Sequence, residues 1–144
     1  MKSEELRIGN LVLDTELNKV VEITMIGKKG ISCFALTYDS KKEDYIYSSK
    51  IEPIPLSEEW VLKFGFEKKV KEDNDSNLIT TYHLGTPNAY FVFEDDWSLA
   101  IADSEDSYEY GWNYLAPRKE LTDKVHLLQN IFYFLTGQEL QYVN

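Results

Sequence analysis

The chain has 144 residues, of which 43% are hydrophobic, so it can build a globular core in one domain or in two small modules. It carries 25 acidic and 15 basic side chains, a formal net charge of −10. The excess is uneven, because residues 71–144 hold 13 acidic and 4 basic side chains. A surface this negative repels phosphate backbones and anionic lipids, which argues against nucleic acid and membranes as partners.

Two features indicate the compartment. No apolar run approaches the roughly 20 residues that span a bilayer, and the first residues have no hydrophobic stretch of the signal-peptide kind. Cys33 is the only cysteine, which excludes an internal disulfide and fits a reducing compartment, so we expect a cytoplasmic protein. Its phase with Ile31 and Ala35 favours a buried small side chain, with a reactive thiol as the alternative.

The first half of the chain alternates short apolar segments with turn residues, a pattern typical of small β modules. Gly27-Lys28-Lys29-Gly30 supplies two residues that tolerate positive φ and predicts a hairpin tip. Pro53 and Pro55 cannot both donate to a sheet, so they end the last strand. The expected strands are 11–13, 19–26, 31–36, 45–47 and 51–54, and their layout resembles an SH3-like barrel over residues 1–56.

Residues 57–144 are expected to form a second module of α+β class. Ser57 is a good N-cap for a short helix that Gly65 closes. Compact polar turns then join the strands of an antiparallel meander, and a helix over 123–136 follows, with Thr122 as N-cap and Gly137 just past its end. The expected strands are 66–70, 78–84, 89–93, 97–102 and 108–115.

Two of these segments indicate which faces are buried. Over 97–102, large and small residues alternate, so we expect core on one face and a closely packed helix on the other. In the terminal helix, apolar residues recur at three- and four-residue steps, and Leu127 and Phe134 widen the stripe, which favours burial on more than one side. The stripe comprises Val125, Leu128, Ile131, Phe132 and Leu135.

Aromatic residues alternate along the expected strand 108–115 and would form a continuous band on one face. Such bands are usually core. Their hydroxyl groups and indole nitrogen also suit a half-wet interface, so the band is our candidate contact with another protein or with a second copy of the chain. The candidate residues are Tyr108, Tyr110, Trp112 and Tyr114.

An acidic stretch from Glu94 to Glu109 contains no basic residue. Three interpretations compete for it: solvated turns at one edge of the meander, a calcium site, and a surface that imitates DNA phosphates to capture a DNA-binding protein. A calcium site at Asp103, Glu105 and Asp106 lacks the glycine and terminal glutamate of the familiar loop. The DNA mimic predicts a contiguous strip of Glu94, Asp95, Asp96, Asp103, Glu105 and Asp106.

Chemically active side chains do not gather at the spacing that a reaction or a metal needs. His83 and His126 are the only histidines, and neither has a carboxylate or thiol at metal-ligand spacing beside it. No glycine-flanked serine or local Cys/His signature marks a nucleophile. We therefore predict no catalytic residue, no metal and no cofactor. A small hydrolase or transferase would require one of these rings to line a pocket with a carboxylate within hydrogen-bond reach.

Three segments, LRIGNLV (6–12), IPLSEEWVLKFGF (54–66) and HLLQNIFYFLTGQEL (126–140), carry a resemblance to a known family. The chain resembles a group of short acidic proteins of gut-dwelling bacteria and of their phages or mobile elements. The resemblance covers the start, the joint and the end of the chain. It implies no activity and no ligand residues, so no functional position is carried over.

The sequence thus predicts an α+β protein in two packed parts that acts as a non-enzymatic accessory protein. It would bind another protein or itself, through the aromatic band around Trp112 or through the terminal helix. An acidic DNA mimic is the second interpretation, and a small hydrolase or transferase is the third.

Overall fold

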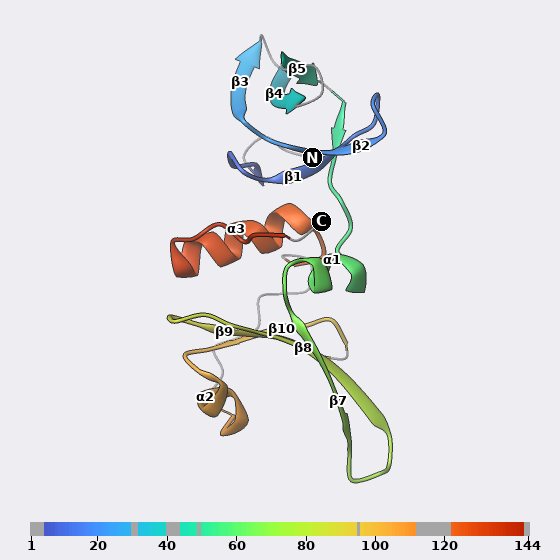
Figure 1. Ribbon diagram of the computed structural model, residues 1–144, viewed down its shortest axis with the longest axis vertical. Helices are drawn as coiled ribbons and strands as arrows, with labels where there is room; N and C mark the ends of the chain where they lie inside the picture. The colour runs from blue at the N-terminus through green and yellow to red at the C-terminus, as the bar shows by residue number, and fades with distance from the viewer. Residues whose placement is uncertain are drawn as a thin grey trace. The chain divides into compact units, whose positions relative to one another are not determined.

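The computed structural model describes residues 5–29, 32–39, 44–48, 50–94, 96–111 and 122–142, with the backbone alone over the described part of 27–48. It is α+β, with antiparallel sheets and short helices (Figure 1). The chain divides into unit 1, Met1–Pro55 with Lys124–Asn130, and unit 2, Leu56–Asp123 with Ile131–Asn144. The boundaries expected from the sequence, 1–56 and 57–144, place all of the C-terminal helix α3 (Val125–Thr136) in the second part, whereas its first turns belong to unit 1.

The described strands of unit 1 form two three-stranded antiparallel sheets, in the orders β2-β1-β6 and β3-β4-β5. The β1–β2 turn is stabilised by Asp14, a buried residue whose carboxylate accepts the backbone N–H groups of Glu16 and Leu17, each at 2.9 Å. The strands are β1 (Leu11–Asp14), β2 (Lys19–Glu22), β3 (Met25–Lys29), β4 (Ser32–Asp39), β5 (Asp44–Ser48) and β6 (Ile51–Glu52).

These strands differ from the expected ones at two places. The segment 19–26 is split into β2 and β3 at Ile23 and Thr24. The hairpin tip predicted at Gly27 to Gly30 is wrong for residues 27–29, because they lie within β3 and Lys29 is paired with Ser32. No closed barrel is found among the described strands of unit 1, so the SH3-like layout stays a prediction.

Side-chain amides, two of them buried, join the first turns of α3 to the N-terminal segment of unit 1. Gln129 accepts the backbone N–H of Leu11 through Oε1 at 2.8 Å and donates Nε2 to the carbonyl of Gly9 at 3.2 Å. Asn10, which is fully buried, donates Nδ2 to Oδ1 of Asn130 at 2.9 Å. We call Asn10, Gln129 and Asn130 the amide clasp. It gives hydrogen-bond partners to polar groups whose burial would otherwise be costly.

Among the residues of unit 1 whose side chains are described, Val12, Val21 and Ile23 form a buried apolar cluster, and Leu6 and Ile51 pack against it.

Unit 2 opens with α1 (Glu58–Lys63), which ends in the way that the sequence predicts. Gly65 takes a φ of +82°, and the N–H of Phe66 reaches back to the carbonyl of Val61 at 3.3 Å, the long bond of a Schellman motif. Ser57 holds the predicted N-cap position with an extended backbone, although its side chain makes no capping hydrogen bond.

A four-stranded antiparallel sheet in the order β10-β9-β8-β7 forms the centre of unit 2 and confirms the first four strands of the predicted meander. Phe91 and Phe93 point to one face, where Phe91 contacts Phe132 of α3 with ring centroids 5.2 Å apart. On the same face, Phe93 contacts Phe66 at 5.4 Å. The strands are β7 (Glu67–Glu72), β8 (Leu78–Gly85), β9 (Tyr90–Phe93) and β10 (Leu99–Ala102).

On the opposite face of this sheet, β10 carries small side chains, and a short helix, α2 (Glu105–Glu109), packs against them. Ala100 and Ala102 of β10 form a buried cluster with Tyr90 and Val92, and Tyr108 of α2 packs against it. In Figure 1, α1 and α2 lie on opposite sides of this sheet. The predicted helix contact on the small-residue face of 97–102 is therefore confirmed.

The strand predicted over 108–115 is wrong in its described part. Tyr108 lies in α2 and Tyr110 is the C-cap residue of that helix. The physical reason is the N-cap, because the Ser104 hydroxyl accepts the backbone N–H of Ser107 at 3.1 Å and starts a helix. This local signal overrides the alternating aromatic pattern.

α3 begins at Val125, so Thr122 is not its N-cap as predicted. The predicted end is confirmed, since Gly137 has a φ of +69° and donates its N–H to the carbonyl of Tyr133 at 2.8 Å. No helix in the described ranges is long and apolar enough to cross a membrane.

Candidate functional site

Four polar side chains meet on the α2-covered face of unit 2. His83 on β8 places Nδ1 3.0 Å from the Tyr90 hydroxyl on β9. Lys69 on β7 donates to the same hydroxyl at 3.4 Å and to Oε1 of Glu105 on α2 at 2.6 Å. The other ring nitrogen of His83, Nε2, lies 2.7 Å from the hydroxyl of Thr81. We call Lys69, His83, Tyr90 and Glu105 the His83 cluster.

The protonation states of this cluster follow from its burial. Burial and the nearby Lys69 ammonium lower the pKa of His83, so its ring is neutral at neutral pH. Burial, together with a hydrogen bond to Glu105, raises the pKa of Tyr90, which keeps its hydroxyl protonated. The hydrogen bond from Lys69 lowers the pKa of Glu105. A neutral imidazole could accept a proton, but the cluster contains no phenolate.

A polar pocket of about 290 Å³ opens beside the cluster and is lined by His83, Lys69, Tyr90 and Glu105, with backbone exposed at Gly65 and Gly85. His83 and a carboxylate therefore share one pocket. In the described contacts of His83, however, both ring nitrogens face hydroxyl groups rather than a carboxylate. This geometry does not supply the imidazole–carboxylate pair that a hydrolase or transferase would require, and that function stays an untested alternative.

The neutral His83 predicts a loss of stability in mild acid. Because its pKa is lower in the folded chain than the ordinary value of 6.5, the unfolded chain binds more protons as pH falls below about 6.5. The stability that His83 contributes is fully present above that pH and declines below it. Urea titrations between pH 7.5 and 5 should show a weaker pH dependence for His83→Gln than for the natural chain. If the free energy of unfolding changed with pH equally in the two proteins, the assignment of a neutral ring to His83 would be contradicted.

The sequence did not indicate Lys69 and Tyr90 as neighbours of His83, although a signal was present. The turn at 73–77 pairs Glu72 with Leu78, which sets Lys69 opposite Thr81 and brings it to the face that His83 occupies. Counting the paired residues of β7 and β8 outward from this turn would have placed Lys69 beside His83.

The aromatic candidates do not form the expected band in the described part of the chain. Tyr108 packs on the alanine face of the sheet and contacts His83 edge-on at 5.8 Å. Tyr110 is 81% exposed. Trp112 and Tyr114 lie outside the described residues. Tyr110 stays a candidate contact residue because it is exposed, whereas Tyr108 packs inside unit 2.

Glu94 and Glu105, which belong to the expected phosphate-like strip, each bind a side chain of unit 2. Glu94 accepts a hydrogen bond from the Tyr108 hydroxyl at 2.7 Å, and burial together with this bond raises the pKa of Tyr108. Glu105 is bound to Lys69 in the His83 cluster. These two groups would have to leave their partners before they could imitate phosphates.

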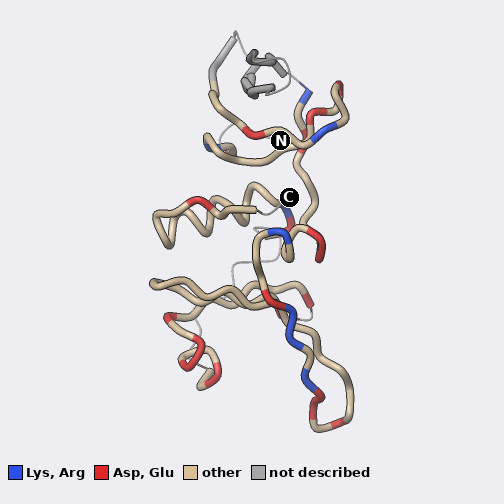
Figure 2. The backbone as a smooth tube through the Cα atoms, viewed as in Figure 1, with Lys and Arg blue, Asp and Glu red and all other residues tan. Residues whose placement is uncertain are grey.

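The other acidic candidates lie at two places. Asp96 accepts the backbone N–H of Ser98 at 2.8 Å in the β9–β10 turn, and Asp103 and Asp106 lie at the start of α2. Asp95 is outside the described residues. Figure 2 shows acidic positions along α2 and, separately, at the β9–β10 turn, while basic positions of unit 2 lie along β7 and in α1. The DNA-mimic interpretation stays a prediction.

The remaining sequence candidates lie in unit 1. His126 is fully buried on α3. The side chain of Cys33 lies outside the described residues.

Over the described residues, no group of three or more histidine, cysteine, aspartate or glutamate side chains could hold a metal ion, and Asp103, Glu105 and Asp106 form no such group.

The end of α3 in unit 2 exposes large apolar side chains. Phe132 is buried at 5% exposure, but Phe134 is 86% exposed, and Tyr133 and Leu135 are 41% and 42% exposed. The stripe predicted from the sequence is thus buried at its centre and open at its C-terminal end. We call Tyr133, Phe134 and Leu135 the α3 apolar end.

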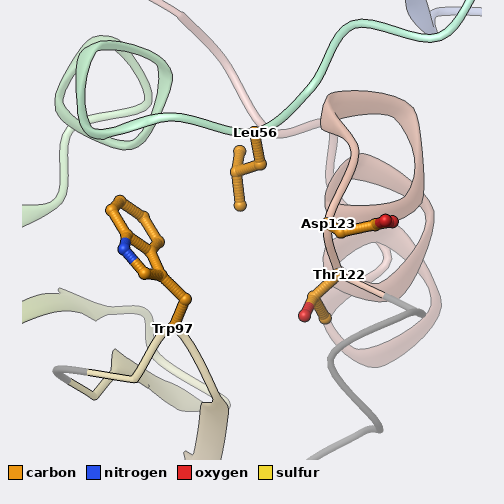
Figure 3. A pocket seen from close by; sticks show the side chains of 4 residues that line it. All are labelled: Leu56, Trp97, Thr122 and Asp123. Carbon is orange, nitrogen blue, oxygen red and sulfur yellow. The ribbon is translucent and has the colours of Figure 1, made fainter.

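A second pocket, of about 190 Å³, is lined by Leu56, Trp97, Thr122 and Asp123 (Figure 3). The Trp97 indole lies on one side of it and Thr122 on the other, with Leu56 between them at the upper edge of the view. A special role for Trp97 was not predicted, because a bulky side chain is not expected at a turn position with a φ of +65°.

Comparisons of the chain with protein-family models, with curated proteins and with solved structures find no match.

Proposed function

We propose that this protein is a non-enzymatic accessory protein that binds a basic partner protein through the α3 apolar end. The observation that carries the proposal is the 86% exposure of Phe134 on a helix whose other face is core. Exposed aromatic side chains grouped with aliphatic ones are typical of protein-binding surfaces, where they supply much of the binding energy.

Charge favours a different protein over a second copy of the chain. Unit 2 contains 16 acidic and 6 basic side chains, while unit 1 contains nine of each, so unit 2 carries the whole net charge of −10. Two copies that met through unit 2 would repel each other. A partner with a basic rim around an apolar socket would be attracted, and its association would weaken with salt.

Site-specific cross-linking in the native host would identify the partner. A photoreactive phenylalanine at Phe134 should cross-link one basic protein, and the same group at Leu78, which is 75% exposed on β8, serves as the matched control. The identified protein, once purified, should bind the natural chain with an affinity that falls as salt is raised. Equal cross-linking from both positions, or binding that is indifferent to salt, would remove the proposal.

Three further parts of the proposal rest on the sequence. We expect unit 1 to follow the SH3-like layout, the protein to act in the cytoplasm, and nucleic acid to be excluded as a partner by charge. A DNA-processing enzyme that binds through the acidic residues instead of Phe134 would favour the DNA mimic.

A further inference from the structure

The pocket beside the His83 cluster has the size and the lining of a site for a small hydrophilic ligand. Its volume of about 290 Å³ lies near the lower end of the range of small-molecule sites. A Cβ added at Gly65 in its wall would meet no atom within 4 Å, so a ligand can approach the backbone there. The polar side chains of the pocket come from four elements: Lys69 on β7, His83 on β8, Tyr90 on β9 and Glu105 on α2.

The hydrogen bonds within the cluster show which polar groups are left for a ligand. Both ring nitrogens of His83 are engaged, by the hydroxyl groups of Thr81 and Tyr90, so the imidazole fixes the Tyr90 hydroxyl in place. An ammonium group has three N–H groups, and Lys69 uses two of them, toward Glu105 and Tyr90. Its third N–H has no acceptor among the described residues. A carboxylate accepts about four hydrogen bonds, and Glu105 accepts from Lys69 and Tyr90.

An N–H and a carboxylate that can each form a further hydrogen bond therefore lie side by side, because Lys69 Nζ and Glu105 Oε1 are 2.6 Å apart. Two neighbouring hydroxyl groups match this arrangement, since one accepts from the ammonium and the other donates to the carboxylate. Lys69 and Glu105 already neutralise each other. An ionic ligand would compete with this ion pair, whereas neutral hydroxyl groups add hydrogen bonds to it.

We propose that the pocket beside the His83 cluster binds a neutral ligand rich in hydroxyl groups, a monosaccharide or a similar cyclic polyol. Adjacent hydroxyl groups of the ligand bridge Lys69 and Glu105, and the buried Tyr90 hydroxyl, held by His83, keeps the ammonium in position. The inference goes beyond the proposed partner binding, because it assigns a second site in unit 2 that does not involve the α3 apolar end.

The test uses the full chain with D-glucose, D-galactose, D-mannose and myo-inositol as probes. The chain has two histidines, so His83→Gln assigns the ring C–H resonances of His83 in NMR spectra. At least one of these polyols should shift the His83 resonances in a saturable way, with a dissociation constant of about 0.1–10 mM. Cyclohexanol, which has a single hydroxyl group, and L-serine, which is a zwitterion, should cause no saturable shift. Resonance shifts are preferred to thermal stability, because sugars stabilise proteins generally by exclusion from their surface.

Two conservative variants test the groups that carry the proposal. Lys69→Met keeps most of the side-chain length but removes the ammonium, and it should weaken the responding polyol at least about tenfold. Glu105→Gln keeps the shape of the carboxylate and should also weaken binding, by about five- to tenfold.

Lys71→Met is the matched control, because Lys71 lies on the same face of β7 but pairs with Glu109 at 3.9 Å. It should change the affinity by less than about twofold. The dispersion of the backbone amide resonances shows whether each variant is folded. The proposal would be overturned by the absence of a response to every polyol, by saturable binding of cyclohexanol or L-serine instead, or by equal affinities of Lys69→Met and Lys71→Met.

Discussion

Replacing Phe91 by alanine should lower the free energy of unfolding by about 3–5 kcal/mol. Phe91 is fully buried in the middle of β9, and its ring contacts Phe132 of α3 at 5.2 Å. The substitution removes this contact and leaves a cavity in the core of unit 2, which surrounding side chains fill only in part. Chemical denaturation followed by circular dichroism measures the change.

Phe134→Ala is the matched control for this prediction. The same atoms are removed, but from a ring that is 86% exposed, so the free energy of unfolding should change by less than about 0.5 kcal/mol. Similar losses for the two variants would mean that the α3 apolar end is core in solution, and the proposed binding surface would then be wrong.

Gln129→Met should destabilise the chain by about 2–4 kcal/mol, because it removes the Gln129 amide from the amide clasp. Methionine keeps a comparable length but leaves the N–H of Leu11 and the carbonyl of Gly9 without the side-chain partner that Gln129 supplies. Each buried polar group that loses its partner costs about 1–3 kcal/mol. Thermal unfolding would show the effect as a lower midpoint.

Gln138→Met is the control, since Gln138 is an exposed glutamine just beyond the end of α3. It should leave the midpoint of thermal unfolding nearly unchanged. If Gln129→Met were equally harmless, the clasp would contribute nothing measurable to unit 1.

Features with strong local chemistry were predictable from the sequence. Gly65 and Gly137 end their helices in the left-handed region, as their positions after apolar segments indicate. The core positions of α3 followed from periodicity, since Val125, Leu128 and Phe132 are buried. In each of these cases the local pattern and the tertiary structure agree.

Features that depend on competition or on long-range contacts were not predictable. Around Tyr108, a period-two aromatic pattern competed with a Ser104 N-cap, and the cap determined the structure. Trp97 has a φ that bulky side chains rarely adopt, so no local pattern predicts this backbone conformation. The amide clasp joins residues about 120 positions apart, which no local pattern relates.

The amide clasp connects the N-terminal segment of unit 1 to α3 through Asn10, Gln129 and Asn130. We interpret these residues as holding the fold of unit 1 together rather than as ligand contacts, because their amides bond to one another and to nearby backbone.

Calorimetry tests the α3 apolar end most directly as the binding surface. It measures the affinity of the purified partner for Phe134→Ala, for the natural chain and for Leu78→Ala. We expect Phe134→Ala to bind at least about tenfold more weakly while Leu78→Ala binds as the natural chain does. Affinities within twofold for all three proteins would contradict the claim that the α3 apolar end is where this protein meets its partner.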